Sequence, residues 1–223
     1  MKLLLKNATL LDEKSPFHNQ TKDILIEKGI VTQLEDHIEN KGAKVINLKN
    51  LHISSGWFDP NVSFGEPGYE ERETLKNGLQ TAAKSGFTNI VLNPNTKPLT
   101  ETHSDVSHLL QSNKNQPTAL HISSVLTEEG KGNQMAPLLD LHKAGAVVFG
   151  DYKTSYNNPN LLRIALDYSQ SFGGLIQAYP INKALSNNGQ MHEGIISTNL
   201  GLKGIPQVAE TTTLARDLQL LDY

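Results

Sequence analysis

The chain has 223 residues, a formal net charge of −3 and no cysteine. The lack of cysteine excludes disulfides and thiolate metal sites, and the weak acidic charge gives no electrostatic reason to expect a nucleic acid or an acidic membrane as a partner. No run of 18 apolar residues is present that would span a bilayer. These properties predict a globular protein of the cytoplasm.

The first fifty residues predict a small layer of β-strands. Glu27-Lys28-Gly29 joins two apolar runs in a way that is typical of a hairpin. Near residue 55 the sequence changes from short strand-like runs to alternating helical and strand-like segments. We therefore predict two domains, 1–54 and 55–223. The expected strands of the first domain are 2–5, 23–27, 30–34, 44–48 and 51–54.

From residue 55 onward, helical and strand-like segments alternate. The alternation predicts βα units and a parallel sheet. Four strong units fit either an open sheet or the front half of a (β/α)8 barrel, and we favour the barrel. The expected helices are 70–85, 135–143, 161–171 and 206–221, and the expected strands are 88–92, 118–125, 146–149 and 175–178.

One long stretch resembles a known family. Residues 55–98 read SGWFDPNVSFGEPGYEERETLKNGLQTAAKSGFTNIVLNPNTKP. This order is similar to that of the dihydroorotases of the amidohydrolase superfamily, in which a strand ends in D-P-H-x-H-x-R-E-P-G and the next strand leads into M-P-N-T-x-P. The later segments AGAVVFGD and NGQMHEGIISTNLGLKGIPQVAE fit the same family. The resemblance covers nearly the whole chain.

The resemblance implies an α/β fold: a metal-dependent (β/α)8 TIM-type barrel with a small β-sandwich domain that includes the N-terminal strands. It also implies an enzyme of pyrimidine biosynthesis that interconverts carbamoyl aspartate and dihydroorotate with zinc. Family chains are roughly twice as long, as eight βα units require. We therefore expect the chain to hold the first half of the barrel, with no catalytic residue within 1–223.

Four positions depart from the family's pattern. Asn61 and Ser63 stand where the family has two metal-binding histidines, and Tyr179 stands where it has a third. The arginine that grips the substrate carboxylate is replaced by Gly65. Neither an amide nor a hydroxyl suits zinc, and glycine offers no cation. The four losses together predict a site that has lost its metal chemistry, so no cofactor is expected unless the protein is active, in which case zinc is expected.

Two family positions keep their residues. Asn95 matches a substrate-contacting asparagine, and Asp151 matches an acidic residue at a strand end that would be a weak metal ligand. Each has a simpler alternative, because Asn95 can hold a turn and Asp151 can be a turn or cap residue. His121 lies in a strand-like run and is expected to be a hydrogen-bonded core histidine.

Three functions remain open at this point. The leading hypothesis is a catalytically degenerate dihydroorotase homologue that forms homo-oligomers and acts as a structural or regulatory partner, for example of aspartate transcarbamoylase. The second is an active cyclic-amide hydrolase with an atypical metal site, which includes Asp151. The third is small-molecule binding at the barrel mouth through Asn95, without turnover. Because half a barrel leaves two open sheet edges, we also expect residues 1–223 alone to associate or to need a partner.

Overall fold

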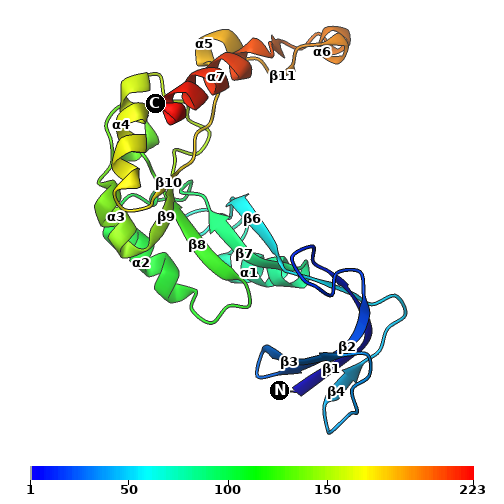
Figure 1. Ribbon diagram of the computed structural model, residues 1–223. Helices are drawn as coiled ribbons and strands as arrows, with labels where there is room; N and C mark the ends of the chain where they lie inside the picture. The colour runs from blue at the N-terminus through cyan, green and yellow to red at the C-terminus, as the bar shows by residue number, and fades with distance from the viewer. Residues whose placement is uncertain (1) are drawn as a thin grey trace. The chain divides into compact units, whose positions relative to one another are not determined.

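The computed structural model describes residues 2–223, and the chain divides into two compact units, Met1–Gly56 and Trp57–Tyr223 (Figure 1). The first unit is a five-stranded sheet in the order β3-β2-β1-β4, with β5 pairing with the far part of β1. The predicted hairpin is confirmed, because β2 and β3 are antiparallel and Lys28 and Gly29 form the turn with positive φ angles of 52° and 83°. The strands are β1 (Lys2–Leu11), β2 (Thr21–Glu27), β3 (Ile30–Glu35), β4 (Lys44–Ile46) and β5 (His52–Ser54).

A buried carboxylate holds this first sheet together. Asp23 is 2% exposed and accepts hydrogen bonds from Lys6 Nζ at 2.6 Å, the Asn7 N–H at 3.0 Å and the Ile38 N–H at 2.9 Å. Burial alone would raise the pKa of Asp23, but these donors outweigh it and hold the pKa below the ordinary value of 3.8. The carboxylate therefore joins β1 and β2 to the segment around Ile38.

The second unit contains five parallel strands in sequence order, from β6 at one edge to β10 at the other. Helices connect consecutive strands and lie on one side of the sheet (Figure 1). This is the topology of the first half of a (β/α)8 barrel, as the sequence predicts. The strands are β6 (Trp57–Val62), β7 (Phe87–Leu92), β8 (Ala119–Ser124), β9 (Ala146–Phe149) and β10 (Leu175–Ile176).

The core of the second unit lies between the sheet and its helices. Leu92, Ile122 and Phe149 of the strands pack there against apolar side chains of all four helices. The other face of the strands carries polar groups, and His121 Nε2 is paired with Asn89 Oδ1 at 3.0 Å. His121 is therefore hydrogen-bonded as expected, but it is half-buried and lies outside the core, which corrects that part of the prediction. The helices are α1 (Leu75–Lys84), α2 (His103–Ser112), α3 (Leu138–Ala144) and α4 (Pro159–Gln170), with a 3-10 turn, η1 (Glu128–Gly130), before α3.

Two helical predictions need correction. Helix α1 begins at Leu75 rather than at residue 70, because Thr74 is the N-cap and its Oγ1 accepts the Asn77 N–H at 3.3 Å. Helix α2 was not predicted at all. Gly86, with φ of 91°, follows α1 in the left-handed conformation that glycine commonly adopts after a helix.

The C-terminal part of the second unit contains short elements and one long helix. Helix α7 packs against α4 and α5, and β11 pairs in parallel with β12. The long helix was predicted within two residues at each end, but the short elements were not. Within residues 2–223, no helix is long and apolar enough to cross a membrane. These elements are α5 (Lys183–Ser186), β11 (Met191–His192), α6 (Ile195–Leu200), β12 (Gly204–Ile205) and α7 (Val208–Asp222).

Candidate functional site

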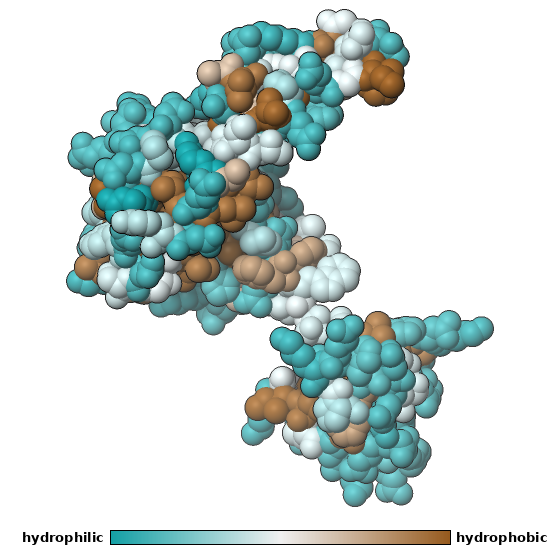
Figure 2. All heavy atoms as spheres, turned by 45° about the horizontal axis from the view of Figure 1, so that its top comes forward, coloured by the Kyte–Doolittle hydropathy of each residue, from teal (hydrophilic) through white to brown (hydrophobic). Residues whose placement is uncertain are grey.

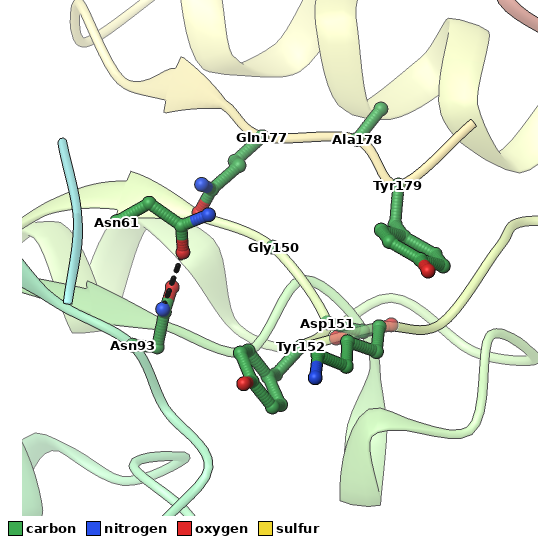
Figure 3. Close-up of a pocket in the computed structure, with 9 residues that line it drawn as sticks. Asn61, Asn93, Gly150, Asp151, Tyr152, Gln177, Ala178 and Tyr179 are labelled. Atoms are coloured by element: carbon green, nitrogen blue, oxygen red, sulfur yellow. Dashed lines mark hydrogen bonds between the residues drawn. The ribbon is translucent and has the colours of Figure 1, made fainter. Parts of the chain in front are cut away.

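A hollow of about 170 Å3 lies at the carboxyl ends of the strands of the second unit (Figure 3). This is the end at which barrels of this type carry their active sites. Three of the six sequence-predicted positions line the hollow together, whereas Ser63, Gly65 and Asn95 do not. The lining residues are Asn61, Asn93, Gly150, Asp151, Tyr152, Lys153, Gln177, Ala178 and Tyr179.

A bulge in β6 sets the direction of Asn61. The register runs over three steps in β6, from Asp59 to Val62, but over only two in β7, from Ile90 to Leu92. Pro60 lies in this bulge, where its missing N–H costs no ladder hydrogen bond. The Asn61 N–H donates to Asp59 Oδ1 at 3.0 Å, so the side chain of Asp59 holds the backbone of the bulge at Asn61.

Asn61 and Ser63 each accept a hydrogen bond from an asparagine that follows β7. Asn93 Nδ2 donates to Asn61 Oδ1, and the two side chains point toward each other at the edge of the hollow (Figure 3). Asn95 Nδ2 donates to Ser63 Oγ at 2.7 Å. Asn93 is a site residue that sequence reasoning missed. The signal that could have found it is its spacing, because Asn93 and Asn95 follow the neighbouring strand with the same i, i+2 spacing as Asn61 and Ser63.

The backbone around Gly65 leaves no room for a side chain. Gly65 is buried, and a Cβ built on it would lie 1.8 Å from the Tyr69 carbonyl oxygen. Hydrogen bonds fix this turn, because the Gly65 N–H donates to the Glu73 carbonyl at 3.0 Å and the Tyr69 N–H donates to the Gly65 carbonyl at 2.7 Å. An arginine at position 65 would therefore require a different backbone, not only a different side chain.

Asp151 ties the end of β9 to the loop after β8. Its Oδ1 accepts the N–H groups of Leu126 at 2.9 Å and Thr127 at 3.1 Å, and its Oδ2 accepts the Thr127 hydroxyl. Asp151 is 4% exposed, and burial raises its pKa above the ordinary value because the three donors offset the desolvation only in part. The side chain thus bridges two loops rather than holding a local turn or a helix end, and the role of Asp151 as a metal ligand stays a prediction.

The remaining wall of the hollow is made of amide, phenol and ammonium groups. Gln177 lies on the side of Asn61, and Tyr179 lies farther along the same segment (Figure 3). Lys153 Nζ is 5.0 Å from the ring centroid of Tyr152, within the range of a cation–π contact. Gln177, Tyr152 and Lys153 could not be singled out from the sequence, although each lies within two residues of Asp151 or Tyr179.

The residues of the hollow do not fit a zinc ion. Zinc is held by histidine nitrogen, cysteine sulfur or carboxylate oxygen. The family positions Asn61 and Tyr179 offer an amide and a phenol instead, and the one lining carboxylate, Asp151, is already engaged by three donors. Across residues 2–223, no group of three or more histidine, cysteine, aspartate or glutamate side chains is placed to hold a metal ion.

The family described as dihydro-orotase-like matches residues 52–222 of this sequence. The chain belongs to this family. It is similar to the dihydroorotase of Pelotomaculum thermopropionicum, with 35% identity over 222 residues, and to that of Syntrophus aciditrophicus, with 34% identity over 227 residues. Each match covers 100% of this chain but only 52% and 53% of the relative. The dihydroorotase-like chain thus spans about half the length of the curated relatives it matches.

Solved structures show the same fold for this dihydroorotase-like chain. The L-hydantoinase from Arthrobacter aurescens superposes with a TM-score of 0.75 at 18% identity, and the match covers 99% of this chain and 50% of that one. A dihydroorotase crystal structure superposes with a TM-score of 0.59 at 11% identity, over 98% of this chain and 62% of that one. These likenesses identify the fold of the parallel sheet and its helices as that of the N-terminal half of a (β/α)8 barrel.

Proposed function

We propose that this dihydroorotase-like chain serves pyrimidine biosynthesis as a catalytically degenerate member that acts through its surface rather than through turnover. The observation that carries the proposal is the pairing of Asn61 with Asn93 and of Ser63 with Asn95. Two positions at which the family binds its metal are occupied by side chains that hydrogen-bond to neighbouring asparagines. The lost arginine position, Gly65, lies in a turn that excludes a side chain.

A site without the metal lacks a large stabilisation of hydroxide. A catalytic metal lowers the pKa of bound water from 15.7 to about 7, which corresponds to on the order of 10 kcal/mol toward hydroxide at neutral pH. Amide and hydroxyl groups such as those of Asn61 and Ser63 carry no net charge and supply no comparable stabilisation. Hydrolysis of a cyclic amide by the mechanism of the family is therefore not expected from this site.

The proposed role is that of a structural or regulatory partner of aspartate transcarbamoylase. A fold can keep a binding surface after its site has lost its chemistry, because surface and site are set by different residues. The second unit exposes apolar side chains that a partner would cover, among them Leu214, Leu218 and Leu221 of α7 at 47%, 52% and 63% exposure. Figure 2 shows such apolar groups on the surface of this unit.

The test of the proposal is hydrolysis of dihydroorotate by the protein in its natural length, supplemented first with zinc and then with manganese. We expect no turnover above the blank, while a family member that carries the H-x-H pair is active in the same assay. Co-purification with aspartate transcarbamoylase from an extract of the source organism is the second arm. Turnover well above the blank would overturn the proposal.

The hollow favours one other candidate function. Its wall retains Asp151, a carboxylate whose pKa burial raises, beside the amide groups of Asn61 and Gln177. An active cyclic-amide hydrolase with an atypical site would use this carboxylate, and turnover in the assay above would establish that function. Saturable binding of dihydroorotate without turnover would instead establish a ligand-binding role at the same mouth.

A further inference from the structure

We propose that Asn61, Ser63, Asn93 and Asn95 form a clasp that joins the ends of β6 and β7 in place of a metal ion. The strand ends would then keep their positions without any divalent cation. This inference rests on the proposed function, because it assumes that the family's metal positions no longer bind metal. It goes further, because it assigns the substituted residues a structural task of their own.

The geometry of the clasp is that of a continued ladder. β6 and β7 are adjacent parallel strands, and the pairs Asn61–Asn93 and Ser63–Asn95 are spaced two residues apart on both. Between the two side-chain bonds, the Asn93 N–H donates to the Val62 carbonyl at 2.8 Å. Three hydrogen bonds in succession therefore hold the end of β6 to the segment that follows β7.

The two halves of the clasp are not equal. Asn93 is 2% exposed and its Nδ2 donates to the exposed Asn61, so Asn93 is the fully buried member of the first pair. Asn95 is half-buried and Ser63 is exposed, so the second pair has no fully buried member. A buried polar group that loses its partner is penalised more than one that is rehydrated. The bond between Asn61 and Asn93 should therefore contribute most of the stability of the clasp.

The clasp is tested by a double-mutant cycle on the full chain. We expect Asn61→Ala and Asn93→Ala each to lower Tm by about 2–4 °C, as the loss of one partly buried hydrogen bond does in a chain of this size. The double variant should melt close to the less stable single variant, because one bond is lost only once. Ser63→Ala and Asn95→Ala should show the same coupling with smaller shifts.

The matched control is Asn157→Ala. Asn157 is exposed, and within residues 2–223 its side chain makes no hydrogen bond, so its loss should leave Tm unchanged. Strictly additive shifts in the Asn61–Asn93 cycle would overturn the clasp. This outcome is independent of turnover, so a failure of the clasp and a failure of the proposed function can be told apart.

A second measurement keeps the proposal testable if the variants fold poorly. The Tm of the unaltered protein should be the same in excess EDTA and in excess zinc chloride, because no cation stabilises the strand ends. A zinc-dependent rise of several degrees in the unaltered protein would reveal metal binding to the native state and would overturn the inference.

Discussion

The backbone around Gly65 turns back on itself, so that the Tyr69 carbonyl oxygen lies where a Cβ would be. At the scale of single residues, a substitution of this kind is more than the loss of one side chain. The neighbouring hydrogen bonds to Glu73 and Tyr69 are part of the closed turn. Restoring one family residue would therefore not restore the family's geometry.

Gly65→Ala tests this closed turn. We expect the substitution to lower the free energy of unfolding by about 1–3 kcal/mol, because the added methyl group must displace the backbone at Tyr69. The matched control is Gly194→Ala, since a Cβ at Gly194 would meet nothing within 4 Å and its φ of 172° is open to any residue. Urea denaturation measures both. Equal stability of the two variants would contradict the geometry at Gly65.

The hydrogen bonds of Asp23 lead us to predict that the stability of the first unit falls at low pH. Its pKa is lower in the folded state than the ordinary 3.8, because Lys6 and two backbone N–H groups favour the carboxylate. The contribution of Asp23 to stability is therefore present above pH 3.8 and is lost as the pH falls through the lower pKa of the folded state. Asp23→Asn should cost about 2 kcal/mol at pH 7 and should remove this part of the acid dependence.

Denaturation of the unaltered protein and of Asp23→Asn between pH 7 and pH 2 checks this expectation. The difference in stability between the two proteins should shrink as Asp23 becomes protonated. Glu70→Gln serves as a control, because Glu70 also has a lowered pKa but its carboxylate is exposed and bonded only to nearby backbone. A constant difference between Asp23→Asn and the unaltered protein at all pH values would refute the role of Asp23.

At the scale of elements, strands and long helices were predictable and helix α2 was not. The parallel strands read as short apolar runs because their ends are buried, as Ile90, Val91 and Leu92 of β7 are. Helix α2 buries only Val106 and Leu109, and its sequence, HSDVSHLLQS, is otherwise polar. Its strongest signal is the capping box formed by Thr102 and Asp105, in which Thr102 Oγ1 accepts the Asp105 N–H at 3.2 Å.

The variant Thr102→Ala tests how much the capping box stabilises α2. We expect a loss of about 1 kcal/mol in unfolding free energy, because one of the unpaired N–H groups at the start of α2 loses its acceptor. Thr102→Ser keeps the hydroxyl and should retain nearly all of the stability. If Thr102→Ala unfolds at the same urea concentration as Thr102→Ser, the capping box is not a determinant of α2.

The candidate site was predictable in its place but not in its contacts. The family pattern placed Asn61 and Ser63 at one strand end and Asp151 and Tyr179 at two others. The sequence does not reveal that Asn61 meets Asn93, because this contact depends on the register of β6 against β7 and on the bulge at Pro60. Side-chain pairing across strands is a property of the assembled sheet.

At the scale of the whole molecule, the second unit has two open sheet edges. Both edge strands expose large apolar residues: Trp57 and Phe58 of β6 are 59% and 55% exposed, and Leu175 of β10 is 64% exposed. Unpaired strand edges with apolar side chains are templates for association. We therefore expect a protein made of these 223 residues alone to form oligomers or aggregates in solution.

Size-exclusion chromatography with light scattering measures this directly. The expected mass is a multiple of 24.5 kDa, increasing with concentration. Trp57→Lys/Leu175→Lys should lower the association, because it places charge on both edges. A strictly monomeric protein with a single cooperative melt would contradict the expected behaviour of the open sheet.

In the structure proposed here, the ends of β6 and β7 hold each other through amide and hydroxyl groups and not through a metal. The most direct test is the metal content of the protein in its natural length, produced in zinc-supplemented medium, dialysed and measured by inductively coupled plasma mass spectrometry. The account predicts far less than one zinc or manganese ion per chain, alongside a stoichiometric content in a family member that carries the H-x-H pair. One tightly held ion per chain would contradict it.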